Sequence, residues 1–512
     1  MWDDFWNWLP SAAYAYHHDS LPWPDLAASL SIFPGYPQGM PLIVTAASLF
    51  AGHFLETAAP VINVALLAGS GALFAEALAA ALVRRGRLHA GEMPLVLIAG
   101  AVAATAFLNP GLDGAVVLSS YADCASMVAT GALGLLGVEI LARLSAGRVG
   151  NVEALSWRFG LVAAMLVNLK QANPVLLALI MAGLVAIALR DPIFRSRKAL
   201  AQLPPMLAPS IVLFAFWRWY VTQNLPNSEQ AFRPIAEWNL GAMHETLFSI
   251  CGLIADRPLF HLMMWSVTGV GLVFLWLPSK ASEAGWLAVV CATVWIGYNV
   301  FLLIVYAGAM SRPDAEIAAD YWRYTPHAAL LGLYMPILAL ASARWPIWIE
   351  RMNLRGPAPS AMAVALALCA LPVRRDLRDP AGRDWQRFLR NATVEMRRLI
   401  PPGSKVLILS ADNSSPFGVA VRYNLWRLAG REQQILPTIL WAGNDFAELK
   451  SVGGGKPHYL VIQDAEAVMD EATHTLGLPA INHELALFVF RKNKWDKLKS
   501  WPIPRDLIHR ET

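Results

Sequence analysis

Residues 286–308 read WLAVVCATVWIGYNVFLLIVYAG and contain no charged side chain. A helix needs about 20 largely apolar residues to cross the hydrocarbon core of a bilayer, so this segment predicts a membrane span. Comparable segments recur along the chain, and we predict spans at 59–83, 93–108, 120–143, 157–169, 174–190, 204–222, 258–278, 286–308, 326–343 and 358–373. The predicted fold class is an α-helical polytopic membrane protein with about ten spans.

The composition of the whole chain agrees with this class. Its 512 residues are 56% hydrophobic and 15% charged, whereas a soluble domain carries about 25% charged residues. The net charge of +4 is small, and no basic tract alternates with aromatic residues, so we expect no nucleic-acid partner. The 4 cysteines lie in apolar segments without a C-x-x-C pair, which argues against a disulfide framework or a zinc site.

The distribution of Lys and Arg among the short loops predicts the orientation of the bundle. Most of these residues fall in one set of alternate loops, which the positive-inside rule places in the cytoplasm. The opposite set of loops and both termini are then on the outer face. Two apolar segments that are too short to span, 41–56 and 241–254, are predicted to lie in the outer interface. The basic loops are at residues 84–87, 143–158, 190–198, 280 and 344–355.

The chain changes character after residue 373. Residues 374–512 are rich in Lys and Arg and begin with an amphipathic basic helix at 384–398. Strands are predicted at 405–409, 458–462 and 485–490, with helices near 416–429 and 443–450. We therefore divide the chain into a first outer loop with juxtamembrane helices (1–57), a transmembrane helical bundle (58–373) and a small periplasmic α/β domain (374–512).

Acidic, basic and aromatic residues gather at the predicted outer ends of the spans. The chain opens with MWDDFWNW, in which Asp3 and Asp4 stand among three tryptophans. Trp is typical of the membrane–water boundary, and a carboxylate held there usually has a function. Four further segments lie on the same side: FPGYPQG at 33–39, YAD at 121–123, KQANP at 170–174 and YWRY at 321–324.

Taken together, these segments resemble those of the GT-C superfamily of membrane glycosyltransferases. The chain is similar to the bacterial protein O-mannosyltransferases and the lipid A aminoarabinose transferases in its acidic pair, its long first outer loop, its Tyr-Pro turn and its polytopic bundle. The resemblance covers most of residues 1–373. One departure is that the helix preceding the acidic pair in that family is absent here, so we expect an upstream membrane helix before Met1.

The resemblance implies an enzyme of the bacterial inner membrane. It would transfer a sugar from a polyprenyl-phosphate donor to an acceptor hydroxyl on a glycolipid, a polysaccharide or a protein, with membrane lipid as a further partner. Asp3, with Asp4 second, is implied as the general base that accepts the hydroxyl proton. A divalent cation, Mg²⁺ or Mn²⁺, stays open as a cofactor, since Asp3, Asp4 and Asp123 would bind it only if the fold brings them together.

The same resemblance implies how the donor is held. Arg323 suits the donor phosphate because its planar guanidinium binds phosphate oxygens in a bidentate manner, and Lys170 and Tyr324 are expected beside it. Fixed positive charge is needed where charge develops on the leaving phosphate. The remaining residues of the predicted substrate cavity are Tyr36, Gln38, Tyr121 and Asp123.

Structural roles compete with these assignments. In these alternatives, Asp3 and Asp4 form a solvated acidic terminus, and Arg323 pairs with Asp320 on one helix. Lys170 would extend its amine to the interface, and Asp123 would cap a helix. The alternative functions are a transporter or flippase of lipid-linked sugars, a lipid-pyrophosphate oligosaccharide polymerase or ligase, and a non-catalytic membrane scaffold.

Overall fold

A computed structural model of the chain describes most of its helices and one sheet. The chain divides into two compact units: unit 1 comprises Met1–Pro34, Val44–Leu55 and Arg378–Thr512, and unit 2 comprises Gly35–Ile43 and Glu56–Leu377. Helix α2 (Gly39–Ala51) is shared between them. The described residues are 4–22, 31, 33–89, 91–147, 152–190, 196–226, 228–276, 282–342, 380–401, 404–410, 416–427, 436–441, 459–463, 478, 484–492 and 494–504.

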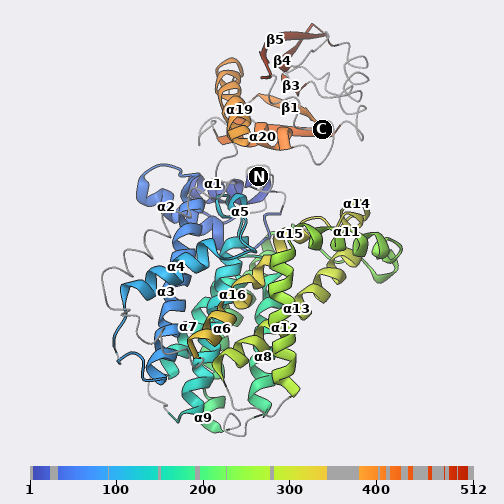
Figure 1. Ribbon diagram of the computed structural model, residues 1–512. Helices are drawn as coiled ribbons and strands as arrows, with labels where there is room; N and C mark the ends of the chain where they lie inside the picture. Colours follow the sequence, from blue (N-terminus) through green and yellow to red (C-terminus); the bar gives the residue numbers. More distant parts are fainter. Residues whose placement is uncertain are drawn as a thin grey trace. The chain divides into compact units, whose positions relative to one another are not determined.

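Unit 2 is a bundle of α-helices (Figure 1). Its longer helices are α3 (Ala58–Arg84), α4 (Leu95–Phe107), α6 (Asp123–Ser145), α7 (Val152–Val167), α8 (Asn173–Arg190), α10 (Leu203–Asn224), α11 (Met243–Asp256), α12 (Pro258–Trp276), α13 (Glu283–Gly308) and α16 (Ala329–Ser342). Shorter elements connect them: α5 (Gly114–Val117), α9 (Arg197–Leu200), η4 (Ile235–Glu237), η5 (Leu240–Ala242), α14 (Arg312–Glu316), α15 (Tyr321–Tyr324) and η6 (Thr325–Ala328).

Seven helices of the described part are long and apolar enough to cross a membrane. They are Ala58–Arg84, Asp123–Ser145, Asn173–Arg190, Arg197–Asn224, Pro258–Trp276, Glu283–Gly308 and Tyr321–Ser342. The spans predicted at 93–108 and 157–169 coincide with the shorter helices α4 and α7, and the one predicted at 358–373 lies outside the described residues. The structure therefore gives a helical protein of membrane-spanning composition.

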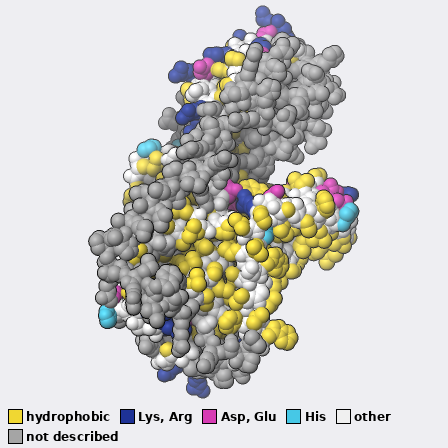
Figure 2. Space-filling view, in the orientation of Figure 1, with side chains coloured by type: hydrophobic (Ala, Val, Ile, Leu, Met, Phe, Trp, Pro, Cys, Tyr) yellow, Lys and Arg dark blue, Asp and Glu magenta, His cyan; other side chains and the backbone are white. Residues whose placement is uncertain are grey.

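Helix α6 forms the centre of the bundle. Its spanning segment is 94% buried, whereas that of α10 is only 17% buried. Helix α10 packs mainly against α7, and the rest of its surface presents apolar side chains such as Ile211, Val212 and Phe216. Apolar side chains also cover much of the bundle surface seen in Figure 2. Such a surface suits contact with lipid, because water would not solvate a continuous apolar band.

Small residues let several helices approach closely. A Cβ at Gly160 of α7 would lie 2.1 Å from the Pro205 carbonyl oxygen of α10, and one at Gly271 of α12 would lie 2.3 Å from the Ala288 carbonyl oxygen of α13. Packing through glycine is typical of helices in membranes, where close van der Waals contact replaces the hydrophobic effect as the main source of association.

The two ends of the bundle carry different elements. Helices α5 and α15 lie at one end and α9 at the other (Figure 1). We call the first the aromatic end, because it includes Tyr121, Trp322 and Tyr324, and the second the basic end, because it includes Arg143, Arg190 and the sequence Arg197-Lys198.

Within unit 1, the C-terminal region forms a five-stranded sheet. The strands are β1 (Lys405–Ser410), β2 (Leu436–Trp441), β3 (Tyr459–Gln463), β4 (Glu484–Arg491) and β5 (Lys494–Pro502), in the order β2-β1-β3-β4-β5. Strand β1 is parallel to β2 and β3, whereas β3, β4 and β5 are antiparallel. The strands predicted at 405–409, 458–462 and 485–490 correspond to β1, β3 and β4; β2 and β5 were not predicted.

Both faces of this sheet are covered by apolar side chains. Alternate residues of β1, such as Val406 and Leu407, point to opposite faces and join different buried clusters. Helices α19 (Pro380–Leu399) and α20 (Pro416–Arg427) cover one face. The N-terminal helices η1 (Asp4–Trp8) and α1 (Leu9–His18) belong to the same unit, and the rings of Phe5 and Tyr423 lie 5.3 Å apart. The helix predicted at 443–450 lies outside the described residues.

Candidate functional site

A buried carboxylate stands at the aromatic end of the bundle. Asp123 is the first residue of α6 and its side chain is 3% exposed. The N-cap position of this helix is Ala122, and no side chain caps it. The capping role considered for Asp123 is therefore wrong, because the carboxylate points to partners on other elements.

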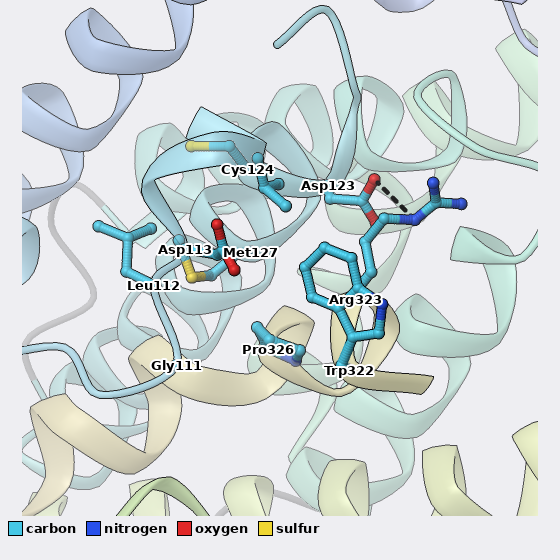
Figure 3. A pocket seen from close by; sticks show the side chains of 10 residues that line it. Gly111, Leu112, Asp113, Asp123, Cys124, Met127, Trp322, Arg323 and Pro326 are labelled. Carbon is cyan, nitrogen blue, oxygen red and sulfur yellow. Dashed lines mark ion pairs between the residues drawn. The ribbon is translucent and has the colours of Figure 1, made fainter. Parts of the chain in front are cut away.

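Three cationic or hydrogen-bonding groups converge on Asp123. The Nζ atom of Lys170, from the turn between α7 and α8, lies 2.6 Å from Oδ1. The Nε2 atom of His327, from η6, lies 2.8 Å from the same oxygen. The Nε atom of Arg323, from α15, is 3.7 Å from Oδ2 (Figure 3). We call Asp123, Lys170, Arg323 and His327 the charged cluster; more than 200 residues of sequence separate Asp123 from His327.

Aromatic rings enclose the two cations of this cluster. The guanidinium carbon of Arg323 lies 4.5 Å from the ring centroid of Tyr121 and 5.1 Å from that of Tyr324. The amine of Lys170 lies 4.8 Å from the Tyr324 ring. Contacts of this kind stabilise a cation that has lost part of its hydration. The side chains of Lys170 and Arg323 are only 11% and 5% exposed, so both have lost most of it.

Arg323 also pairs with the residue at the start of its own helix. Its Nη2 atom lies 3.0 Å from Oδ2 of Asp320, which is 37% exposed. Ala318 and Asp320 have φ angles of 48° and 63°, in the left-handed region that side chains with a Cβ rarely adopt. Non-glycine residues in this region cost free energy and are often found beside functional sites.

His327 is a member of the cluster that the sequence reasoning missed. Its ring is fully buried; Nε2 faces Asp123, and Nδ1 lies 3.0 Å from the hydroxyl of Tyr298 on α13. Its position just after Pro326, at the start of a predicted apolar span, was the available signal. A polar ring at such a point needs partners inside the bundle.

A small cavity adjoins Asp123 and Arg323 (Figure 3). Its volume of about 20 Å³ is room for about one water molecule. Asp113 and Trp322 line it, and Arg257 binds both of them: its Nη2 atom lies 2.7 Å from Asp113 and its guanidinium carbon lies 5.2 Å from the Trp322 ring centroid. The ion pair of Arg257 and Asp113 therefore stands beside the charged cluster.

The two predicted cavity residues of the first loop lie near the turn that carries Lys170. The hydroxyl of Tyr36 lies 3.3 Å from Oε1 of Gln230, and the amide of Gln38 donates to the carbonyl oxygen of Tyr36. The backbone amide of Gly39 donates to the carbonyl oxygen of Asn168, two residues before Lys170. A Cβ at Gly39 would come within 2.4 Å of that oxygen, so this close approach requires glycine.

The predicted site residues thus fall into three sets. The structure brings together Arg323, Lys170, Tyr324, Tyr121 and Asp123. Tyr36 and Gln38 pack beside the turn that holds Lys170. Asp3 lies outside the described residues, and Asp4 begins η1 in unit 1.

The described residues do not suit a divalent cation at the charged cluster. No group of three or more His, Cys, Asp or Glu side chains with metal-binding geometry occurs among them. Asp123, the buried carboxylate of the cluster, already faces Lys170 and Arg323, whose positive charges would repel a metal ion. We therefore derive no chemical step through Mg²⁺ or Mn²⁺.

Comparisons with known proteins identify no relative of this chain. No protein-family model, no curated protein and no solved structure matches the chain.

Proposed function

We propose that the protein is a membrane glycosyltransferase of the GT-C type, which takes a sugar from a polyprenyl-phosphate donor and transfers it to an acceptor hydroxyl. The observation that carries this proposal is the charged cluster at the aromatic end of the bundle. Its two cations and the two tyrosine rings that pack on them come from three separate elements, and arginine and lysine are side chains that bind phosphate oxygens.

The burial of these charges supports a functional role. A charged side chain between membrane helices is costly unless it is paired or serves an ion or substrate. Here Asp123 faces Lys170, Arg323 and His327, and Asp320 gives Arg323 a second, partly exposed carboxylate, so the two buried cations would carry an excess of positive charge once Asp320 moves away. An arginine fork and a lysine amine that are fixed in this way are prepared to receive an anion.

In our proposal, the donor phosphate enters where Arg323 now contacts Asp320. The carboxylate of Asp320 is partly exposed and bound to Arg323 through one oxygen, as a phosphate oxygen would be. In our proposal the donor phosphate displaces Asp320, while Asp123 continues to hold the inner side of Arg323. Because the adjacent cavity has room for only about one water molecule, the segment from Ala318 to Arg323 must move to admit the donor.

The reaction that we propose is a substitution at the anomeric carbon of the donor sugar. The acceptor hydroxyl oxygen forms a bond to that carbon, and the bond from the carbon to the phosphate oxygen breaks with its electron pair on the phosphate. Arg323 and Lys170 stabilise the charge that develops there. The hydroxyl proton passes to a carboxylate, for which Asp3, with Asp4 second, remains the sequence-based prediction.

The membrane topology belongs to the same proposal. We propose ten spans, with the aromatic end on the outer face of a bacterial inner membrane and the C-terminal domain in the periplasm. The charged cluster would then face a donor at the outer surface. The apolar face of α11, with Leu247 and Phe248 exposed, supports the predicted position of residues 241–254 in the outer interface.

The decisive experiment measures sugar transfer by the full chain in membranes supplied with radiolabelled polyprenyl-phosphate sugar. We expect Arg323→Ala to lower the rate by about 10²–10³-fold, the usual effect of removing one group that stabilises transition-state charge. Arg323→Lys should recover part of the rate, because it restores the charge without the fork.

The matched control is Arg312→Ala, which removes an exposed arginine of α14 that pairs with Glu316 on the same helix. This variant should transfer sugar at the parent rate. Equal rates for Arg323→Ala and Arg312→Ala would contradict the phosphate assignment. Parent-level transfer by Asp3→Asn and Asp4→Asn would contradict the assignment of the base alone.

A further inference from the structure

An apolar groove lies toward the basic end of the bundle, between α6, α8, α9 and α10. Its volume is about 280 Å³, close to the lower end of the range for small-molecule pockets. Leucine and methionine side chains, among them Leu141, Leu184 and Met206, form most of its wall, and Gln202 is the one polar residue among the described residues that line it. Gly137 is the lining residue nearest the charged cluster along α6, about 20 Å from Asp123 along the helix axis.

The packing of α10 explains why this groove exists. Helix α10 packs mainly against α7, which it approaches closely at Gly160, while α8 packs mainly against α13. Between α8 and α10, side chains of α6 such as Leu141 and Leu144 therefore line an open space. The hydroxyl of Ser156 on α7 binds Gln202 at 3.0 Å, which fixes the start of α10 at the edge of the groove.

Four cations lie close in sequence to lining residues of the groove. Arg143, between the lining residues Leu141 and Leu144, pairs with Glu139, and Arg190, directly after the lining residue Leu189, donates to the carbonyl oxygen of Phe274. Arg197 and Lys198 directly precede the lining residues Ala199 and Leu200, and both are exposed. No carboxylate within the described residues forms an ion pair with either of these two side chains. Figure 2 shows Lys and Arg side chains at this end of the bundle.

We propose that the groove binds one acyl chain of an anionic glycerophospholipid, with the lipid phosphate on Arg197 and Lys198. The apolar wall suits a hydrocarbon chain and excludes a polar ligand. These two exposed cations, which form no ion pair among the residues that the structure describes, favour an anionic headgroup over a zwitterionic one, since each juxtamembrane Lys or Arg contributes attraction to an anionic lipid. This site is separate from the charged cluster and does not depend on the proposed enzyme activity.

The test uses the full chain purified in detergent. Phosphatidylglycerol or phosphatidylcholine with the same acyl chains is added, and both the thermal midpoint and the number of lipids retained in native mass spectrometry are measured. We expect phosphatidylglycerol to raise the thermal midpoint and to be retained by the protein. Phosphatidylcholine should raise the midpoint less and be retained in smaller numbers. An equal response to the two lipids would overturn the proposal.

Two pairs of variants locate the site. Ala199→Trp fills the groove, and its control Ala201→Trp adds the same ring at an exposed position two residues away. Only Ala199→Trp should lose the response to phosphatidylglycerol. If Ala199→Trp does not fold, the charge variants decide, because they change exposed side chains only.

For the headgroup, Arg197→Gln with Lys198→Gln is compared with Arg85→Gln and Arg158→Gln, two exposed cations that are not adjacent in sequence to a lining residue of the groove. Apparent affinity for phosphatidylglycerol should fall by about fivefold for each charge removed from the first pair, and stay unchanged for the second pair. Equal losses in both pairs would overturn the site. The proposal would also be overturned if polyprenyl phosphate bound more tightly than phosphatidylglycerol and Ala199→Trp weakened that binding. The groove would then bind the donor lipid.

Discussion

Helix α6 carries a carboxylate at each end of the bundle, and the two have different surroundings. Asp123 is 3% exposed and faces Lys170, His327 and Arg323, whose side chains are 11% exposed or less. Glu139, near the other end, is 18% exposed and pairs with Arg84 and Arg143, of which about a third is exposed. Both carboxylates have two cationic partners, so the difference between them lies in burial.

This difference separates two uses of charge in a membrane bundle. At the basic end, the cations are partly solvated, so their ion pairs contribute little free energy. Arg197 and Lys198 at this end are exposed, and in our proposal they contact a lipid headgroup. At the aromatic end, Asp123 is needed to compensate two cations that have lost their water. The residues of a buried cluster therefore depend on one another, whereas those at the basic end act independently.

The largest expected effect is the loss of the inner carboxylate. Asp123→Asn should lower the free energy of unfolding by about 3–5 kcal/mol, because it removes the buried carboxylate that faces both Lys170 and Arg323. Glu139→Gln, at the other end of the same helix, should cost about 1 kcal/mol or less. Thermal unfolding of the full chain in one detergent compares the two, and similar shifts would remove the distinction that we draw between the ends.

The hydrogen bond from Tyr298 to His327 provides a smaller test of mutual dependence. Tyr298→Phe should cost about 1 kcal/mol, since it removes one buried hydrogen bond and leaves the ring in place. In a double-mutant cycle with Asp123→Asn, the two losses should not add, because both residues position His327. Simple additivity would show that Tyr298 acts independently of the cluster.

Asp320 tests whether Arg323 is the point at which phosphate binds. Asp320→Asn removes the exposed carboxylate that competes for Arg323 and leaves Asp123 in place. The KM for the polyprenyl-phosphate donor should fall by about two- to fivefold, which corresponds to the modest free energy of a partly exposed ion pair. A raised KM would indicate that Asp320 helps to hold the donor and would contradict the displacement step.

The smallest effect is expected in the sheet of unit 1, where an exposed pair joins neighbouring strands. Burial raises the pKa of Glu484 on β4, but hydrogen bonds from Lys497 and Ser500 and the charge of Lys497 lower it more, so the pKa lies below its ordinary value of 4.5. A lowered carboxyl pKa contributes stability above the ordinary value, and this contribution is lost as the pH falls through the lowered one.

Hydrogen exchange of residues 484–502 measures this contribution. Protection relative to intrinsic rates should decline slightly as the pH falls below about 4.5, and Glu484→Gln should reduce that decline. The charged cluster of unit 2 should be insensitive to the same substitution. A decline of equal size in the variant would assign the pH dependence to other groups.

The sequence predicted the helices of the bundle well, because hydropathy is a local property. Segments such as 286–308 are apolar over about 20 residues, and α13 covers that range in the structure. The Tyr-Trp-Arg-Tyr segment and Lys170 were also identified from their position at span ends. Strands β2 and β5 were missed, since Pro437 interrupts one and five charged or polar side chains occur in the other.

Hydropathy along the chain was enough to predict a helical protein of membrane-spanning composition, with charged residues at the ends of its spans. Which of those charges meet became known from the packing of the helices. His327 gave a weak signal as a single residue, yet it joins Asp123 to Tyr298 across three elements. The physical reason is that apolar length is encoded along the chain, whereas a buried ion pair is encoded by the packing of helices that are distant in sequence.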